Sequence, residues 1–385
     1  MNRSRELRAA LAHLVALEGE GADDPWAGAV ATVPREVFVP GYFEEIAGSV
    51  PTRFRAVRQS DGDWLEGAYA DRTLVTQLDG RVRPQDVAAG GDVGGAPTSS
   101  STLPSLVVRM WRQLGVEPGH KVLEIGTGTG YSTALGTHRL GDGAVTSVEY
   151  DPQVASAARV ALSAAGFAPR LVVGDGLQGA ADGAPYDRLI ATCAVRHVPL
   201  AWLHQVRPGG RILATLSGWG YASGLALLTV TRPGTAEGRF LPGHTSFMLA
   251  RPHERPPRPV LHLLPGEERP TRIDPAVVGT WTGGWIAQLA APQAERMGAG
   301  SGQILWDVST GSQARTAPAP GGDGWRVVQR GPMRLWDEVE AAVLRWQEAG
   351  APHQEDFRIA VGPDGDQRVW IEGEGEEEAG WRLPV

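Results

Sequence analysis

Three glycines and two acidic residues are spaced as in α/β sites that bind a nucleoside. Gly126, Gly128 and Gly130 directly follow a short apolar run that contains Glu124. Because glycine has no Cβ, a glycine turn between a strand and a helix lets backbone N–H groups approach a ligand closely. Glu149 lies 25 residues beyond Glu124, close to the offset of about 20 residues at which such sheets place a carboxylate on ribose hydroxyls.

A third acidic residue extends this pattern. The apolar run at 170–173 leads into Gly174, Asp175 and Gly176. Asp175 is therefore expected to accept a hydrogen bond from an adenine amino group. The alternative is that Glu149 and Asp175 are solvated acids at strand ends. Since the glycine turn and both acids occur in register, the sequence predicts a site for an adenosine-containing ligand without a 2′-phosphate.

The elements that must position these residues are predicted to alternate between strand and helix. Strands are expected at 122–125, 144–149, 170–173, 186–192 and 211–216, the last after a turn at 208–210. Helical stretches separate them, one of which begins near Tyr131. Such alternation indicates βαβ units and a mostly parallel sheet. The expected fold class is α/β.

Four motifs carry a family resemblance. In chain order they are V-P-R-E-V-F-V-P (33–40), A-Y-A-D-R (68–72), S-S-T-L-P (100–104) and V-L-E-I-G-T-G-T-G-Y (122–131). The last resembles motif I of Rossmann-like class I S-adenosylmethionine methyltransferases. As a set they resemble the protein-L-isoaspartate (D-aspartate) O-methyltransferase family over roughly residues 6–217. The resemblance implies S-adenosyl-L-methionine as cofactor, bound by Glu124, Gly126, Thr127, Gly128, Tyr131, Glu149, Asp175 and Gly176.

The family resemblance also supplies a catalytic candidate. Thr102 aligns with the active-site serine of the family motif T-I-S-Q-P, and Leu103 replaces its glutamine. A carboxylate is already ionised and nucleophilic at neutral pH, so the enzyme mainly has to orient it. Thr102 is predicted to donate the orienting hydrogen bond, with Ser101 beside it. The alternative is that Thr102 only caps the helix expected to begin near Pro104.

Substrate contacts are expected from two further places. The resemblance implies that Tyr69 and Ala70 of A-Y-A-D-R contact the substrate. They lie within a segment (68–74) that is predicted to be extended. Arg196 and His197 follow the fourth strand, where α/β sheets bind ligands, although exposed loop charges are the alternative. The chain departs from the family at 73–79 and in a loop expected at 81–101, a region that frames the isoaspartyl peptide in the family.

Composition narrows the functional class. The chain has 385 residues and a net charge of −8, which argues against a nucleic-acid partner. Its single cysteine, Cys193, excludes a disulfide framework and is predicted to be a small buried residue. The nine histidines show no metal-ligand spacing, so no metal is expected. No apolar run is long enough to span a membrane, and a cytoplasmic location is expected.

Four segments are predicted along the chain. Residues 1–100 form a helical and extended region framing the substrate, 101–250 the methyltransferase core, and 251–260 a proline-rich linker. Residues 261–385 are expected to form a small α+β domain that recognises peptide; it holds eight of the thirteen tryptophans. A helix is predicted at 335–348, strands at 357–361 and 368–372, and a solvated acidic turn at 372–378.

The C-terminal extension bears on the expected function. Ordinary isoaspartyl repair enzymes are expected to lack it, and the chain resembles family homologues that tailor ribosomally made peptides of the graspetide or lanthipeptide type. That resemblance implies methylation of an aspartyl side chain in a macrocyclic precursor, the ester then closing to an aspartimide. Two alternatives stay open: repair of isoaspartyl residues in damaged proteins, and a non-catalytic S-adenosylmethionine-binding protein that recognises peptides.

Overall fold

The computed structural model describes residues 2–19, 24–88, 90–257, 260–373 and 380–384. They form two compact units, each described by itself below. Unit 1 comprises residues 1–192 and 204–213, and unit 2 comprises residues 193–203 and 214–385. The unit boundary therefore differs from the four predicted segments.

Three helices open unit 1: α1 (Asn2–Leu17), α2 (Pro25–Thr32) and α3 (Arg35–Phe38). On α1, Leu11 and Val15 are buried, whereas Leu14 is exposed. Trp26 of α2 stacks on Trp111, with ring centroids 5.3 Å apart. Helices α1 and α2 thereby pack against α5 (Pro104–Leu114), which leads into the parallel sheet.

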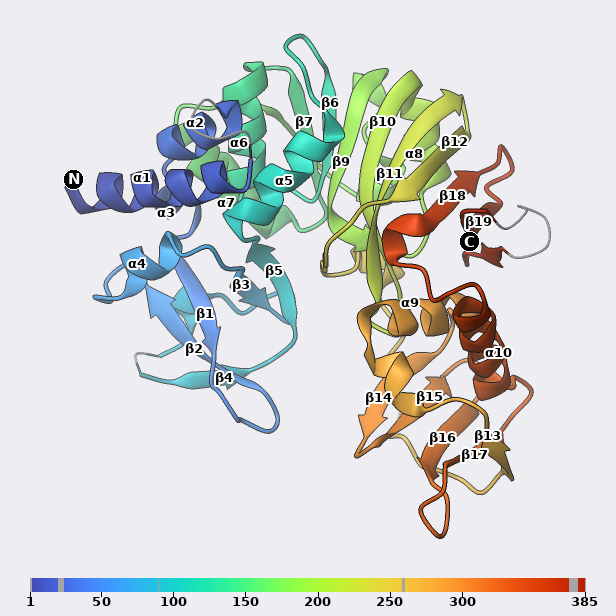
Figure 1. Ribbon diagram of the computed structural model, residues 1–385. Coiled ribbons are helices and arrows are strands. Elements are labelled where there is room, and N and C mark those ends of the chain that lie inside the picture. The colour runs from blue at the N-terminus through green and yellow to red at the C-terminus, as the bar shows by residue number, and fades with distance from the viewer. Residues whose placement is uncertain (1, 20–23, 89, 258–259, 374–379, 385) are drawn as a thin grey trace. The chain divides into compact units, whose positions relative to one another are not determined.

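An antiparallel sheet follows, with strand order β4-β2-β1-β3-β5 (Figure 1). Its strands are β1 (Gly41–Glu45), β2 (Arg53–Arg58), β3 (Leu74–Leu78), β4 (Asp92–Gly94) and β5 (Pro97–Ser101). The prediction of a loop over 81–101 is wrong, because β4 and β5 lie within it. The extended prediction for 68–74 is wrong over most of its length, since helix α4 (Trp64–Ala68) ends in a turn there and β3 begins only at Leu74. Pairing between strands distant in sequence outweighs local composition.

The predicted parallel sheet is present in unit 1. Strands β8 (Arg170–Val173), β7 (Val145–Glu149), β6 (Val122–Ile125) and β9 (Tyr186–Val195) pair in parallel in that order. Helices α6 (Tyr131–Leu140) and α7 (Pro152–Ala164) connect them. Strand β10 (Val206–Ser217) includes residues 208–210, which were predicted as a turn. Like β9, it crosses from one unit to the other.

Unit 2 contains two antiparallel strand arrays. In the first, β11 (Ser223–Arg232), β12 (Thr235–Phe240), β18 (Phe357–Val361), β19 (Gln367–Ile371) and β20 (Trp381–Arg382) pair in that order. The second has the order β13-β17-β16-β15-β14, with β13 (Glu267–Thr271), β14 (Glu295–Ala299), β15 (Gly302–Asp307), β16 (Ser312–Pro318) and β17 (Trp325–Arg330). Helices α9 (Trp281–Ala290) and α10 (Leu335–Glu348) pack against each other.

This pairing corrects the predicted 261–385 domain. The helix expected at 335–348 is α10, and the two C-terminal strands lie within one residue of prediction. However, β18 pairs with β12, which precedes the linker, so residues 241–356 are inserted between two neighbouring strands. Most of the predicted acidic turn (374–378) lies outside the described residues. Buried tryptophans such as Trp285 and Trp336 form much of the core of this unit.

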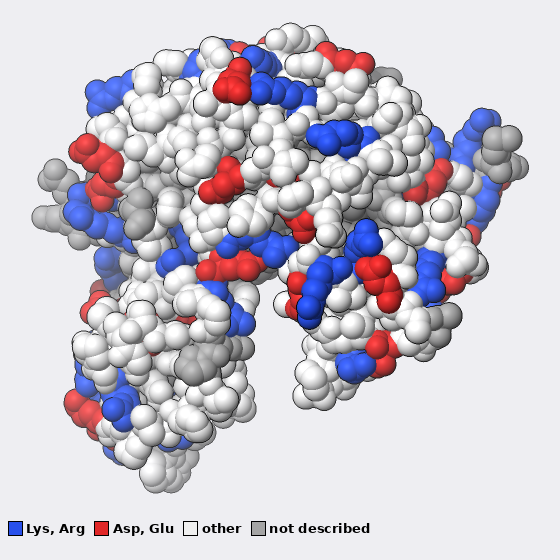
Figure 2. Space-filling model, turned by 180° about the vertical axis from the view of Figure 1, so that it is seen from behind, with Lys and Arg blue, Asp and Glu red and all other residues white. Residues whose placement is uncertain are grey.

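Acidic and basic side chains are interspersed over the face drawn in Figure 2. Within the described ranges, no helix combines the length and apolar character needed to cross a bilayer. The same residues contain no cluster of three histidine, cysteine or acidic side chains arranged to hold a metal ion.

Candidate active site

Strand β6 leads directly into the glycine turn that the sequence singles out. Gly126, Gly128 and Gly130 have φ values of +95°, +53° and +90°, a region that favours glycine. A Cβ at Gly128 would lie 3.3 Å from the carbonyl oxygen of Ser100. The turn therefore packs closely against the end of β5, two residues before Thr102.

Glu124 stabilises this turn from the interior. Its carboxylate is fully buried and accepts hydrogen bonds from Ser132 (2.6 Å), Thr133 (2.5 Å) and Ser147 (2.7 Å). Burial raises the pKa of Glu124. These bonds tie the end of β6 to the start of α6 and to β7. The prediction made Glu124 a cofactor ligand, whereas its contacts in the structure are to hydroxyls that fix the turn.

Glu149 lies at the carboxyl end of β7, beside the turn. Its Oε2 accepts from the Gly128 N–H at 2.8 Å and its Oε1 from the Asp151 N–H at 3.0 Å. Burial raises the pKa of Glu149. A carboxylate offers about four lone-pair positions, so two are used by these backbone groups. The side chain is partly exposed, and the other positions suit ligand hydroxyls.

Asp175 and Gly176 follow β8 at the same edge of the sheet. Asp175 Oδ1 accepts from the Leu177 N–H at 2.9 Å and caps a short helix. A Cβ at Gly176 would come within 2.5 Å of Ile125 Cγ2. Glycine is thus required where this segment packs against the end of β6. The carboxyl ends of neighbouring parallel strands meet at this edge, where α/β sheets bind ligands. Together with Glu149, this arrangement fits an adenosine moiety.

Two residues of the predicted cofactor set have structural contacts instead. Thr127 is buried and its hydroxyl is 2.6 Å from that of Ser147. The Tyr131 ring is also buried, with its centroid 5.9 Å from that of Phe38 and 5.6 Å from the Arg35 guanidinium. Burial raises the pKa of Tyr131. Tyr131 therefore packs in the interior of unit 1, on the side of the N-terminal motifs.

One buried arginine joins three of the sequence motifs. Arg35, from V-P-R-E-V-F-V-P, has no solvent exposure, and burial lowers its pKa to about 10. Its guanidinium donates to the carbonyls of Ala70 (2.7 Å), Arg72 (3.2 Å) and Thr102 (3.2 Å). The segments A-Y-A-D-R and S-S-T-L-P are thus both fixed by the same side chain. Sequence reasoning assigned no role to Arg35.

Thr102 is partly exposed and does not cap α5. The N-cap residue of that helix is Leu103, and the Ser105 N–H is bound instead by Asp71 Oδ1 at 2.9 Å. Ser101 differs from Thr102, because its hydroxyl is buried and has no hydrogen-bond partner among the described residues. Successive side chains of extended backbone point to opposite faces. The structure thus favours Thr102 over Ser101 as the hydroxyl accessible to a substrate.

Tyr69 and Ala70 do not present side chains suited to substrate contact. The Tyr69 hydroxyl donates to Glu36 and accepts from Arg8 Nε at 3.1 Å, and the ring is buried. Burial alone would raise the pKa of Glu36, but hydrogen bonds from Ser4 and Tyr69 lower it. Ala70 contributes its carbonyl to Arg35. The motif A-Y-A-D-R is therefore structural in its first part.

Arg196 and His197 are likewise engaged within unit 2. The Arg196 guanidinium lies 3.9 Å from the Trp219 ring centroid and donates to the Pro292 carbonyl at 3.0 Å. His197 Nδ1 is 2.8 Å from the Pro384 carbonyl, and its ring packs 4.5 Å from that of His253. Burial, then the nearby His197 and Arg196, lowers the pKa of His253 to about 4. Arg196 and His197 were predicted to face the substrate from a loop, whereas in the structure their side chains pack against other residues of unit 2.

Two supporting residues were also missed by sequence reasoning. Thr192, at the end of the predicted fourth strand, donates to the carbonyls of Gly126 (2.5 Å) and Ile125 (3.1 Å). Gln77 of β3 donates to Asp151 Oδ2 at 2.9 Å and joins the N-terminal sheet to α7. The sequence did offer a signal for Thr192: it ends a strand expected to lie beside the one that leads into the glycine turn. Nothing in the local sequence indicated the partner of Gln77.

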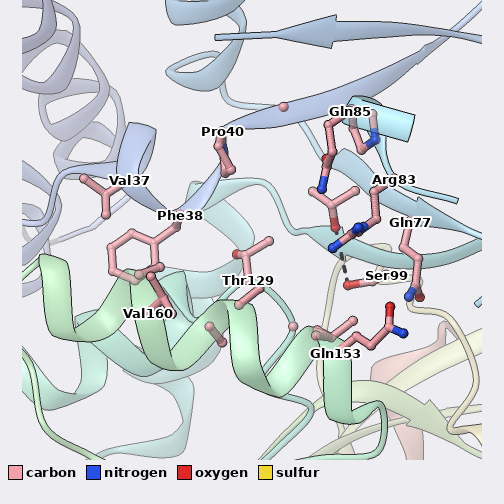
Figure 3. A pocket seen from close by; sticks show the side chains of 18 of the residues that line it. Val37, Phe38, Pro40, Gln77, Arg83, Gln85, Ser99, Thr129, Gln153 and Val160 are labelled. Carbon is pink, nitrogen blue, oxygen red and sulfur yellow. Dashed lines mark hydrogen bonds between the residues drawn. The ribbon is translucent and has the colours of Figure 1, made fainter. Parts of the chain in front are cut away.

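A cavity of about 460 Å³ adjoins the glycine turn within unit 1. Gly128 and Thr129 form part of its wall, together with α7, the end of α3 and the segment after it, and residues of β3 and β5 (Figure 3). Its size is within the range typical of ligand sites. Ser99 of β5 lines it, three residues before Thr102.

Comparison with known proteins identifies the family to which the chain belongs. The family model described as protein-L-isoaspartate (D-aspartate) O-methyltransferase matches residues 85–225. A protein-L-isoaspartate O-methyltransferase of Hyperthermus butylicus is 30% identical over 245 residues, covering 61% of this chain and 85% of that protein. The enzyme of that name from Thermotoga maritima is 35% identical over 203 residues, covering 52% of this chain and 53% of its own length.

A solved structure of a protein-L-isoaspartate O-methyltransferase shares the fold with a TM-score of 0.55 at 20% identity. The likeness covers 95% of this chain and 99% of that chain. The extension expected to be absent from such enzymes thus has a structural counterpart in one of them, and that prediction is wrong. The chain has the class I methyltransferase fold and matches the Hyperthermus butylicus enzyme over 85% of that enzyme's length. It therefore belongs to the protein-L-isoaspartate (D-aspartate) O-methyltransferase family of S-adenosylmethionine-dependent carboxyl O-methyltransferases.

Proposed function

We propose that this enzyme methylates the free carboxylate of isoaspartyl residues in proteins or peptides. The observation that carries the proposal is the position of Thr102. Its backbone is fixed by Arg35, and the strand before it packs against the glycine turn at Gly128. Relatives that bear the name protein-L-isoaspartate O-methyltransferase support this substrate class.

The protein's contribution is mainly orientation. S-adenosylmethionine, when bound, supplies an electrophilic methyl group on a sulfonium centre. Glu149 and Asp175 are suited to hold its adenosine part, and the glycine turn its methionine part. The Thr102 hydroxyl would donate to one oxygen of the substrate carboxylate, so that the other oxygen faces the methyl group. Because an ionised carboxylate needs no base, positioning of this kind can account for much of the acceleration.

A second candidate is methylation of an ordinary aspartyl side chain in a macrocyclic peptide, followed by closure to an aspartimide. Leu103 stands where the family has glutamine, and β3 and β5 occupy the segment where the chain departs from the family. These changes favour a substrate of different shape. The C-terminal extension does not favour this candidate over the first, because the solved structure of a protein-L-isoaspartate O-methyltransferase has a counterpart to it.

A paired methyl-transfer assay with mass detection tests both candidates. One substrate is a linear isoaspartyl peptide and the other a macrocycle containing normal aspartate. The proposal expects methylation of the linear peptide. Activity on the macrocycle alone, with a methyl gain followed by methanol loss, would establish tailoring. Retained binding of S-adenosylhomocysteine without transfer to either peptide would favour the non-catalytic alternative.

A further inference from the structure

The cavity beside the glycine turn has an apolar wall and a polar end. Val37, Phe38, Pro40 and Val160 line the apolar wall (Figure 3), and so do Ala157 and Ala161, which share α7 with Val160. None of these six side chains carries a polar atom. Small alanines on the helix leave the space that the cavity occupies. The wall therefore suits an aliphatic or aromatic group.

The polar end carries amides and hydroxyls in place of free charges. Gln77, Gln153 and Ser99 line it. The Gln77 amide is already bonded to Asp151 (2.9 Å) and Thr98 (2.9 Å), and Ser99 accepts from Thr76 at 3.4 Å, so Gln153 and Ser99 are the groups offered to a ligand. Among the described residues of the lining, Arg83 is the one that carries a charge, and it is paired with Asp86 at 3.2 Å. Neutral donors and acceptors of this kind match peptide amide groups better than a phosphate or a carboxylate. The lining thus selects an uncharged ligand with an apolar body and amide edges.

The cavity is also close to the proposed reaction centre. Gly128 and Thr129 belong to the glycine turn, and Ser99 precedes Thr102 on the same extended segment. Three residues of extended backbone span roughly 10 Å. A peptide with its carboxylate at Thr102 could therefore reach the cavity with a side chain about three residues away.

From these observations we propose that the cavity is a specificity subsite for an apolar side chain of the substrate, about three residues from the methylated carboxylate. This inference rests on the proposed carboxyl methylation of a peptide and adds a sequence preference to it. Gln77, Arg83 and Ser99 come from 73–79 and 81–101, the two segments in which the sequence is expected to differ from its family, whereas Gln153 comes from α7. A preference set by these residues would therefore be particular to the substrates of this enzyme.

The test uses short peptides with one central isoaspartyl residue and otherwise serine and glycine. Two peptides carry leucine three residues before or three residues after the isoaspartate, and the reference peptide carries serine at both places. Burial of one leucine side chain corresponds to an affinity gain of about tenfold or more. We expect one leucine peptide to show a KM about tenfold lower than the reference, with kcat little changed, because this contact is made equally in substrate and transition state.

A matched pair of variants locates the effect. Ala161→Trp fills the cavity and should abolish the leucine preference while the reference peptide reacts as with the wild type. Ser156→Trp places the same ring on the exposed part of α7, outside the lining, and should keep the preference. Should Ala161→Trp fold poorly by circular dichroism, Ala157→Asp introduces a charge into the same wall and should weaken leucine binding.

Calorimetric titration of the peptides into the full-length enzyme with S-adenosylhomocysteine separates the two proposals. If no peptide is methylated, the proposed function fails, yet the leucine preference can still be read from Kd. Equal affinities of all three peptides for the wild type would overturn the subsite. So would a leucine preference that survives both cavity variants.

Discussion

The hydroxyl of Thr102 is the residue on which the proposed chemistry most depends. Thr102→Val keeps the side-chain shape and removes the hydrogen-bond donor. We expect kcat for methyl transfer to fall by about 10- to 100-fold, because a misoriented carboxylate loses alignment with the methyl group. Binding of S-adenosylhomocysteine, measured by calorimetry, should be unchanged.

Two controls accompany that variant. Thr102→Ser restores a hydroxyl and should recover most of the activity. Ser101→Ala removes a buried hydroxyl that has no partner among the described residues, and should be neutral for kcat. Wild-type kcat in Thr102→Val would refute the role of Thr102.

Glu149 is expected to make cofactor binding at the proposed site depend on pH. Burial raises its pKa above the ordinary value of glutamic acid, about 4.3. The protonated form therefore appears at a higher pH than for an exposed glutamate, and it loses acceptor capacity toward ribose hydroxyls. We expect the Kd for S-adenosylhomocysteine to rise as the pH falls from 7 toward 5.

Glu149→Gln is the matching variant for this measurement. It should weaken binding by about 10- to 100-fold at pH 7, since charge-assisted hydrogen bonds are lost. Its Kd should then vary less with pH than that of the wild type. The assignment is wrong if the two proteins share the same pH profile.

At the scale of elements, the loops around the site depend on Arg35. In Arg35→Met, the carbonyls of Ala70, Arg72 and Thr102 lose their shared donor. Unsatisfied buried polar groups cost about 1–3 kcal/mol each, so the free energy of unfolding should fall by about 3 kcal/mol or more. Urea denaturation followed by circular dichroism measures this change.

Arg35→Lys separates charge from geometry at this position. A lysine ammonium lacks the planar fork of a guanidinium and cannot serve all three carbonyls in the same arrangement. It should recover only part of the stability and of kcat. Wild-type stability in both variants would mean that the three motifs are held together by other contacts.

At the scale of the whole molecule, the chain cannot be shortened at its proline-rich segment without consequences. A protein ending at Pro257 would lack β18–β20, and β12 would become an unpaired edge. It would also lose Trp285, whose ring lies 5.1 Å from that of Phe240. Exposed strand edges and apolar surface promote association.

We therefore expect this truncated protein to aggregate and to unfold at a lower temperature than the full chain. Size-exclusion chromatography and thermal unfolding provide the measurements. A monomeric product with the wild-type Tm would show that residues 1–257 fold without the rest of the chain, as the prediction of a separate domain over 261–385 implies. If the truncated protein misfolds, a loss of peptide binding would reflect the misfolding and would not show that the removed residues recognise the peptide.

The sequence by itself determined the features that depend on local pattern. Alternating apolar strands and helices predicted the parallel sheet, and the glycine turn with Glu149 and Asp175 predicted the candidate cofactor site. The helix over Leu335–Glu348 also followed from its apolar periodicity. These features are encoded by residues close in the chain, so they can be recognised without knowing what packs against them.

Only the tertiary structure decided which residues support these local features. The roles of Arg35, Thr192 and Gln77 arise from partners 35 to 74 residues away in sequence, and no spacing rule specifies such contacts. Pairing of β18 with β12 across an insertion is equally non-local. Tyr69, Tyr131 and Arg196 have side chains that could serve a ligand or the interior, and packing assigned them to the interior because their partners lie there.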